Sequence, residues 1–70
     1  MSRDDEQVVA RWRREVRRTL PGSDADFAEE LAQYIADRWV AARARGLTPE
    51  AADAQAQADL VEWRGRPLPA

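Results

Sequence analysis

The segment Arg43-Ala44-Arg45-Gly46-Leu47-Thr48-Pro49-Glu50 contains the signals that end one helix and begin another. Arginines in the last turn suit the negative end of a helix dipole, and Gly46 can take the left-handed conformation that often follows a helix. Thr48 is a favoured N-cap residue, and proline is favoured at the first helical position after it. The segment therefore predicts two helices joined by a short turn.

Before this turn, apolar residues recur at helical spacing and predict a helix over residues 24–45, capped by Ser23 or Asp24. The apolar face consists of Phe27, Leu31, Tyr34, Ile35, Trp39 and Ala42. Arg38 falls near the middle of this face, where a charge is costly unless it is compensated. Either its stem packs at the rim while the guanidinium reaches water, or the guanidinium pairs with an acid on another helix or on a partner chain.

The remaining residues predict two more helices, over residues 3–19 and 49–63. In the first, Val9, Trp12, Val16 and Leu20 are spaced by three, four and four residues and share one face. The sequence thus predicts an all-α fold, a small three-helix domain over residues 1–64. The first two helices are expected to be antiparallel, and an extended linker or tail is expected over residues 65–70.

Each predicted helix carries one tryptophan. We expect Trp12 and Trp39 to lie in the core, because apolar residues of the same face flank both of them. The third helix has few large apolar residues, so Trp63 is the better candidate for a partner interface, together with Leu60 and Arg38.

A basic surface is expected on the first helix. It comprises Arg11, Arg13, Arg14, Arg17 and Arg18. One interpretation is a solvated face on which Glu15 pairs with Arg11 and Arg18; another is attraction to an anionic membrane surface. Binding of nucleic acid through this helix is a third hypothesis, although we expect no nucleic-acid partner. The predicted third helix argues against a helix-turn-helix reader, because its acids, Glu50, Asp53, Asp59 and Glu62, would repel phosphates.

The composition excludes several classes of site. The chain of 70 residues has no histidine and no cysteine, and all 11 of its basic side chains are arginine. Imidazole bases, thiol nucleophiles, zinc fingers and Schiff-base lysines are therefore absent. We expect no enzyme and no catalytic, cofactor or metal site. Because no apolar run approaches the roughly 20 residues of a membrane span, we also expect no such span.

Two stretches resemble a known family. They are Phe27-Ala28-Glu29-Glu30-Leu31-Ala32-Gln33-Tyr34-Ile35 and Ala44-Arg45-Gly46-Leu47-Thr48-Pro49-Glu50-Ala51-Ala52. Their layout is similar to that of the permease prefix domain, a small helical module at the N-terminus of bacterial ABC-type permeases, and to related domains of membrane sensors. The resemblance implies a non-catalytic, cytoplasmic protein-interaction module whose partner is a PadR-type transcriptional regulator. In that case an apolar strip of the second and third helices would dock on the partner.

The residues also allow an alternative, a stand-alone helical adaptor or antitoxin-like protein that associates with a second copy of itself. Both hypotheses assign the chain a protein partner.

Overall fold

The computed structural model describes residues 3–65, and within that range the chain forms three α-helices and no strand. α1 spans Arg3–Thr19, α2 spans Ala25–Ala44 and α3 spans Pro49–Arg64. The predicted all-α three-helix fold is confirmed, and the helix ends lie within one residue of the predicted bounds. Residues 1–2 of the predicted domain and residues 66–70 of the predicted tail lie outside the described range.

The end of α2 has the geometry that the sequence predicts. Gly46 adopts a φ of 99°, in the left-handed region that glycine enters without a steric penalty. Its backbone N–H donates to the carbonyl of Arg43 at 3.0 Å, and the N–H of Leu47 donates to the carbonyl of Ala42 at 3.1 Å. This pair of bonds is a Schellman motif, which satisfies two carbonyls that would otherwise be left open at the helix end.

Side-chain oxygens cap the starts of α2 and α3. The Thr48 hydroxyl accepts from the backbone N–H of Ala51 at 3.1 Å, and the Asp24 carboxylate accepts from the N–H of Asp26 at 3.2 Å. Of the two N-caps considered for α2, the structure uses Asp24. The neighbouring Ser23 hydroxyl instead donates to the carbonyl of Leu20 at 2.7 Å and stabilises the turn after α1.

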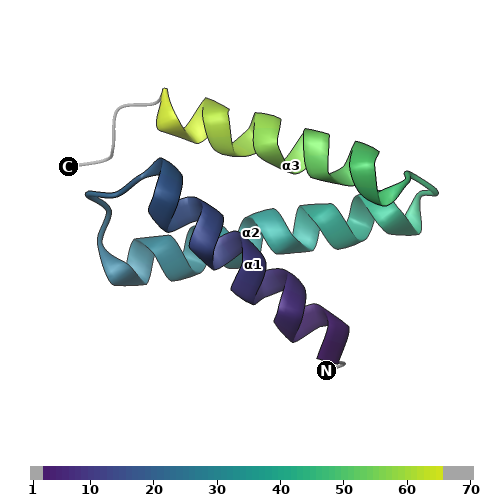
Figure 1. Cartoon of the computed structure of the whole chain (residues 1–70), viewed down its shortest axis with the longest axis horizontal. Helices are drawn as coiled ribbons and strands as arrows, with labels where there is room; N and C mark the ends of the chain where they lie inside the picture. The colour runs from purple at the N-terminus through teal and green to yellow at the C-terminus, as the bar shows by residue number, and fades with distance from the viewer. Residues whose placement is uncertain (1–2, 66–70) are drawn as a thin grey trace.

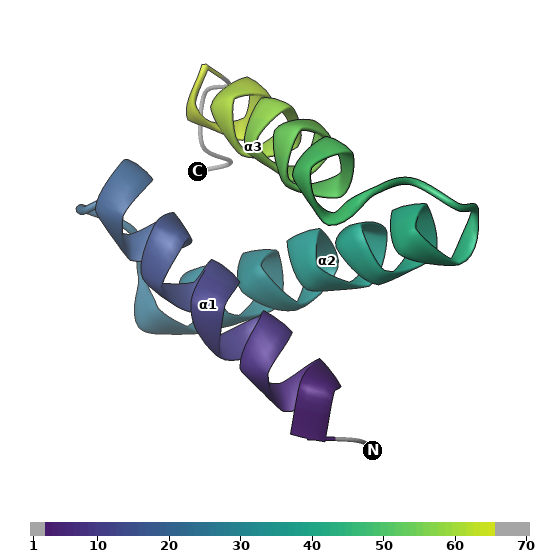
Figure 2. The same cartoon turned by 45° about the vertical axis from the view of Figure 1, so that its right-hand side comes forward.

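The chain reverses direction at both turns, and α1 crosses α2 obliquely (Figures 1 and 2). α1 packs most extensively on α2, α3 packs on α2 to a smaller extent, and α1 and α3 meet least. α2 is therefore the central helix, against which the other two are placed.

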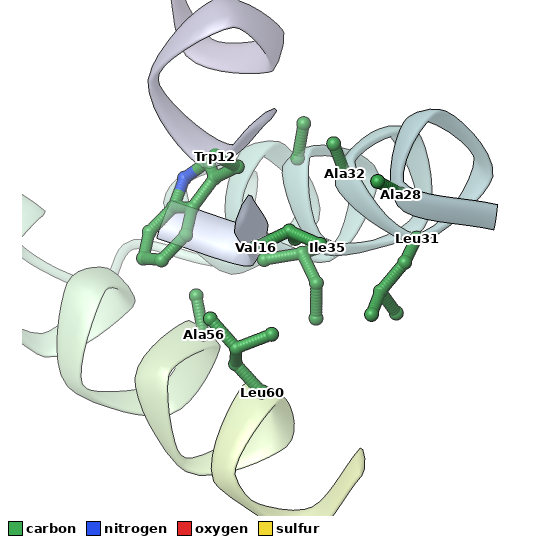
Figure 3. Close-up of a cluster of buried hydrophobic side chains, with 9 residues drawn as sticks. Trp12, Val16, Ala28, Leu31, Ala32, Ile35, Ala56 and Leu60 are labelled. Atoms are coloured by element: carbon green, nitrogen blue, oxygen red, sulfur yellow. The ribbon is translucent and has the colours of Figure 1, made fainter. Parts of the chain in front are cut away.

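A small core fills the junction of the three helices (Figure 3). Its largest fully buried side chains are Trp12, Ile35, Leu60 and Val16. Much of the remaining core is alanine, at positions 28, 32, 36 and 56. Alanine removes little apolar area from water, but its short side chain lets helices approach closely. Trp12 supplies the bulk that these alanines lack.

The predictions for the three tryptophans and for Leu60 can be compared with this core. Trp12 is fully buried, as predicted, whereas Trp39 and Trp63 are partly buried and pack against the core from outside. Leu60, which we expected at a partner interface, is 0% exposed and lies between α3 and the other helices. Its role is structural, because a side chain with no accessible surface cannot touch a partner of the folded chain.

Candidate interaction surface

One carboxylate connects all three helices. Asp53 of α3 accepts two hydrogen bonds from the Arg11 guanidinium of α1, each of 2.9 Å. It also accepts a 2.7 Å bond from the indole N–H of Trp39 on α2. The hydrogen bonds from Arg11 hold the pKa of the Asp53 carboxyl below its usual value, and the bond from Trp39 acts in the same direction. The Asp53 carboxylate thus favours its charged form. We call a side-chain contact of this kind, which connects two or more helices, a joint.

A second pair joins α1 to α2. Arg13 donates to both carboxylate oxygens of Glu29, with a distance of 2.7 Å between Nη2 and Oε1. The hydrogen bond from Arg13 lowers the pKa of Glu29. Bidentate geometry of this kind fixes the relative position of two helices more firmly than a single contact does.

These ion pairs occupy two of the five arginines of the predicted basic surface. Arg11 and Arg13 belong to joints between helices, so the expected pairing of Arg11 with Glu15 is replaced by the pair with Asp53. Arg18 does approach Glu15, at 4.0 Å. Arg14 and Arg17 are exposed and form no ion pair with any residue from 6 to 65, the part of the chain whose side chains the structure describes. The outward basic surface is therefore smaller than the sequence predicts.

A shallow hollow on this side of α1 is lined by Arg11, Arg14, Glu15 and Arg18. The wall includes an acid, and Arg11 is already bound by Asp53. The net positive charge left for an anion is small, which disfavours this hollow as a phosphate or lipid headgroup site.

The structure shows that Arg38 pairs with an acid on another helix of its own chain. Its Nε donates to Asp59 of α3 at 2.6 Å, and 46% of its side chain is exposed. The guanidinium carbon also lies 5.6 Å from the centre of the Tyr34 ring, a cation–π distance. Arg38 thus occupies the rim between α2 and α3 and pairs with an acid on another helix.

Three aromatic rings meet on the same side, and we call Phe27, Tyr34 and Trp63 the aromatic surface. The Trp63 ring lies edge-on to Phe27, with 6.0 Å between centroids, and edge-on to Tyr34, with 6.4 Å. Phe27 and Trp63 are partly buried, and Tyr34 is 46% exposed. This geometry brings together Arg38 and Trp63 of the predicted interface, while Leu60 lies beneath in the core.

Sequence reasoning did not assign Tyr34, Phe27 or Asp53 to a surface or a joint. For Asp53 a signal exists, because it precedes the buried Ala56 and Leu60 by three and seven residues and shares their helical face. An acid on an apolar face demands a partner, as Arg38 does. The periodicity places the two aromatic residues on the apolar face of α2, but it does not separate the exposed edge of that face from its centre.

Among residues 6–65, whose side chains the structure describes, no cluster of acids has the geometry to hold a metal ion. The same described part of the chain contains no helix with the length and hydropathy needed to cross a membrane. Comparison with protein-family models, with curated proteins and with solved structures finds no match to this chain.

Proposed function

We propose that the chain is a non-catalytic, cytoplasmic protein-interaction module that binds its partner through the aromatic surface of α2 and α3. We further propose that it acts as the N-terminal prefix of an ABC-type permease or membrane sensor, and that the partner is a PadR-type transcriptional regulator. The three-helix order and the Gly46-Leu47-Thr48-Pro49-Glu50 turn support the prefix assignment.

The aromatic surface is the observation that carries the proposal. Large aromatic side chains dominate the energy of many protein interfaces, and here three of them are gathered outside a core in which four of nine residues are alanine. Tyr34 exposes nearly half of its surface in the free chain, so a partner could remove substantial apolar area from water.

The basic side of α1 is the weaker candidate. Two of its five arginines stabilise the packing of the helices, and salt-dependent binding of nucleic acid needs several arginines free to contact phosphates. Protein binding through the aromatic surface therefore explains more of the observed geometry.

The test is binding of the 70-residue chain to a PadR-type transcriptional regulator, measured by isothermal titration calorimetry. We expect Tyr34→Ala to weaken binding by at least about tenfold, the effect of removing an aromatic hot spot from an interface. The matched control is Val40→Ala, which trims another exposed apolar residue of α2 and should leave the affinity unchanged.

Light scattering of the same samples measures the oligomeric state. If the chain is a dimer and Tyr34→Ala dissociates it, the partner of the aromatic surface is a second copy of the chain. That result would favour the self-associating adaptor over the regulator-binding module. A monomer that does not bind the regulator would overturn the proposal.

A further inference from the structure

The aromatic surface runs beside a stripe of acids on α2. Phe27, Leu31, Tyr34 and Arg38 are spaced by four, three and four residues and therefore share one face of the helix. Asp26, Glu30 and Asp37, spaced by four and seven residues, form a second line next to it. Glu30 lies four residues before Tyr34 and Asp37 three residues after it, so both neighbour its ring. We call Asp26, Glu30 and Asp37 the acidic stripe.

The acidic stripe is exposed and has no cation of its own. None of its three carboxylates forms an ion pair with a residue of the range 6–65, in which the structure describes the side chains; Asp37 accepts a hydrogen bond from the Gln33 amide at 3.2 Å. Asp59, the nearby acid of α3, is already paired with Arg38. The border of the aromatic surface on α2 therefore keeps a net negative charge over about three helical turns.

The opposite flank of α2 shows what such an acid can bind. There Glu29 receives the Arg13 guanidinium of α1, while the apolar stripe of α1 packs Trp12 and Val16 against α2. α1 is thus an amphipathic helix that docks on α2 by an apolar stripe with an arginine beside it. Glu30, the next residue, has no such partner within the described part of the chain.

From this contrast we infer that the aromatic surface binds an amphipathic helix whose apolar stripe is bordered by arginine or lysine. This inference rests on the proposed function and specifies the chemistry of the partner. The apolar residues of the incoming helix contact Tyr34 and Trp63, and its basic residues face the acidic stripe; amphipathic helices bind other proteins by their apolar face in this way. The same acids repel a nucleic acid or an anionic bilayer from this face.

The probe is a synthetic 18-residue helical peptide with leucines on one face and arginines beside them. Its twin carries glutamate in place of each arginine. Each peptide is titrated into the isotopically labelled 70-residue chain and followed by NMR. We expect the arginine peptide to shift the signals of Phe27, Tyr34 and Trp63, and the glutamate twin to bind at least about tenfold more weakly.

A pair of double variants isolates the charges. Glu30→Gln with Asp37→Asn removes two acids of the stripe and should weaken the arginine peptide about fivefold, as expected for two ion pairs at an interface rim. Glu6→Gln with Glu50→Gln removes two exposed acids elsewhere and should leave the affinity unchanged.

The outcomes separate this inference from the proposed function. If Tyr34→Ala weakens both peptides and neutralising the stripe changes neither, the aromatic docking surface stands and the basic partner is wrong. Shifts confined to α1, or binding of anionic vesicles to the aromatic surface, would also overturn the inference. Binding of the PadR-type regulator is measured independently of all these results.

Discussion

At the scale of single residues, charged side chains on apolar faces are the informative positions. Arg38 interrupts the apolar face of α2 and pairs with Asp59, and Asp53 interrupts that of α3 and pairs with Arg11. The sequence alone indicates that such residues need partners, because an unpaired charge beside a core is costly. It does not indicate which partner, since that depends on the distance between helices far apart in the chain.

Substitution of Leu60 tests whether its side chain belongs to the core or to a partner interface. Leu60→Ala should lower the free energy of unfolding by about 2–5 kcal/mol, because it removes a fully buried side chain and leaves a cavity. Urea denaturation followed by circular dichroism measures this loss.

The neighbouring Val61 is the control for that change. It is 58% exposed, so Val61→Ala should change the free energy of unfolding by less than about 0.5 kcal/mol. Equal effects of the two substitutions would contradict the placement of Leu60 in the core.

At the scale of the elements, the helix ends could be read from sequence because their signals are local. The cap at Thr48 and the glycine at position 46 act on backbone groups within a few residues, so no tertiary information is needed. The crossing of α1 over α2 could not be read in the same way. It depends on the packing of Trp12 and Val16 in one buried cluster with residues of α2 and α3.

The left-handed glycine at the end of α2 can be tested against a second glycine. Gly46→Ala should cost about 1 kcal/mol of stability, because a β-carbon disfavours a φ of 99°. In Gly22→Ala the backbone lies outside the left-handed region, and no described heavy atom lies within 4 Å of the new methyl group. That change should stabilise the chain by about 0.4–1 kcal/mol by restricting its unfolded state. Thermal melting of both variants measures the two effects, and a neutral Gly46→Ala would refute the assigned conformation.

At the scale of the whole molecule, ion pairs contribute to the relative placement of the helices. α1 is tied to α2 and to α3, and α2 to α3, each through an arginine and a carboxylate. The sequence supports the fold class and the helix bounds, yet the aromatic surface is complete only after α3 is placed on α2. Trp63 illustrates this, since its contacts with Phe27 and Tyr34 join residues 36 and 29 positions apart.

These pairs predict how stability depends on pH. The pKa of Asp53 is lower in the folded chain than its usual 3.8, through its bonds to Arg11 and Trp39. A lowered pKa means that the contribution to stability is complete above the unfolded value and is lost as the pH falls through the folded value. Stability should therefore hold between about pH 5 and 8, where no histidine titrates, and fall below about pH 4.

Asp53→Asn measures how much of the loss of stability at low pH comes from the joint that Asp53 forms with Arg11 and Trp39. We expect the difference in unfolding free energy between pH 7 and pH 3 to shrink in this variant, and to persist in Asp37→Asn, whose exposed side chain is bound by a neutral amide. An unchanged difference in Asp53→Asn would show that the joint contributes nothing to acid sensitivity.

Trp12 has a consequence for how far this fold can still be improved. Its indole Nε1 is buried and finds no acceptor among the residues that the structure describes, and a donor left unsatisfied in this way costs about 1–3 kcal/mol. A bicyclic ring of the same outline with sulfur in place of the N–H group would fill the same space without that penalty. Replacing Trp12 by such an analogue should therefore stabilise the fold. None of the twenty genetically encoded side chains removes this donor while keeping the shape of the ring.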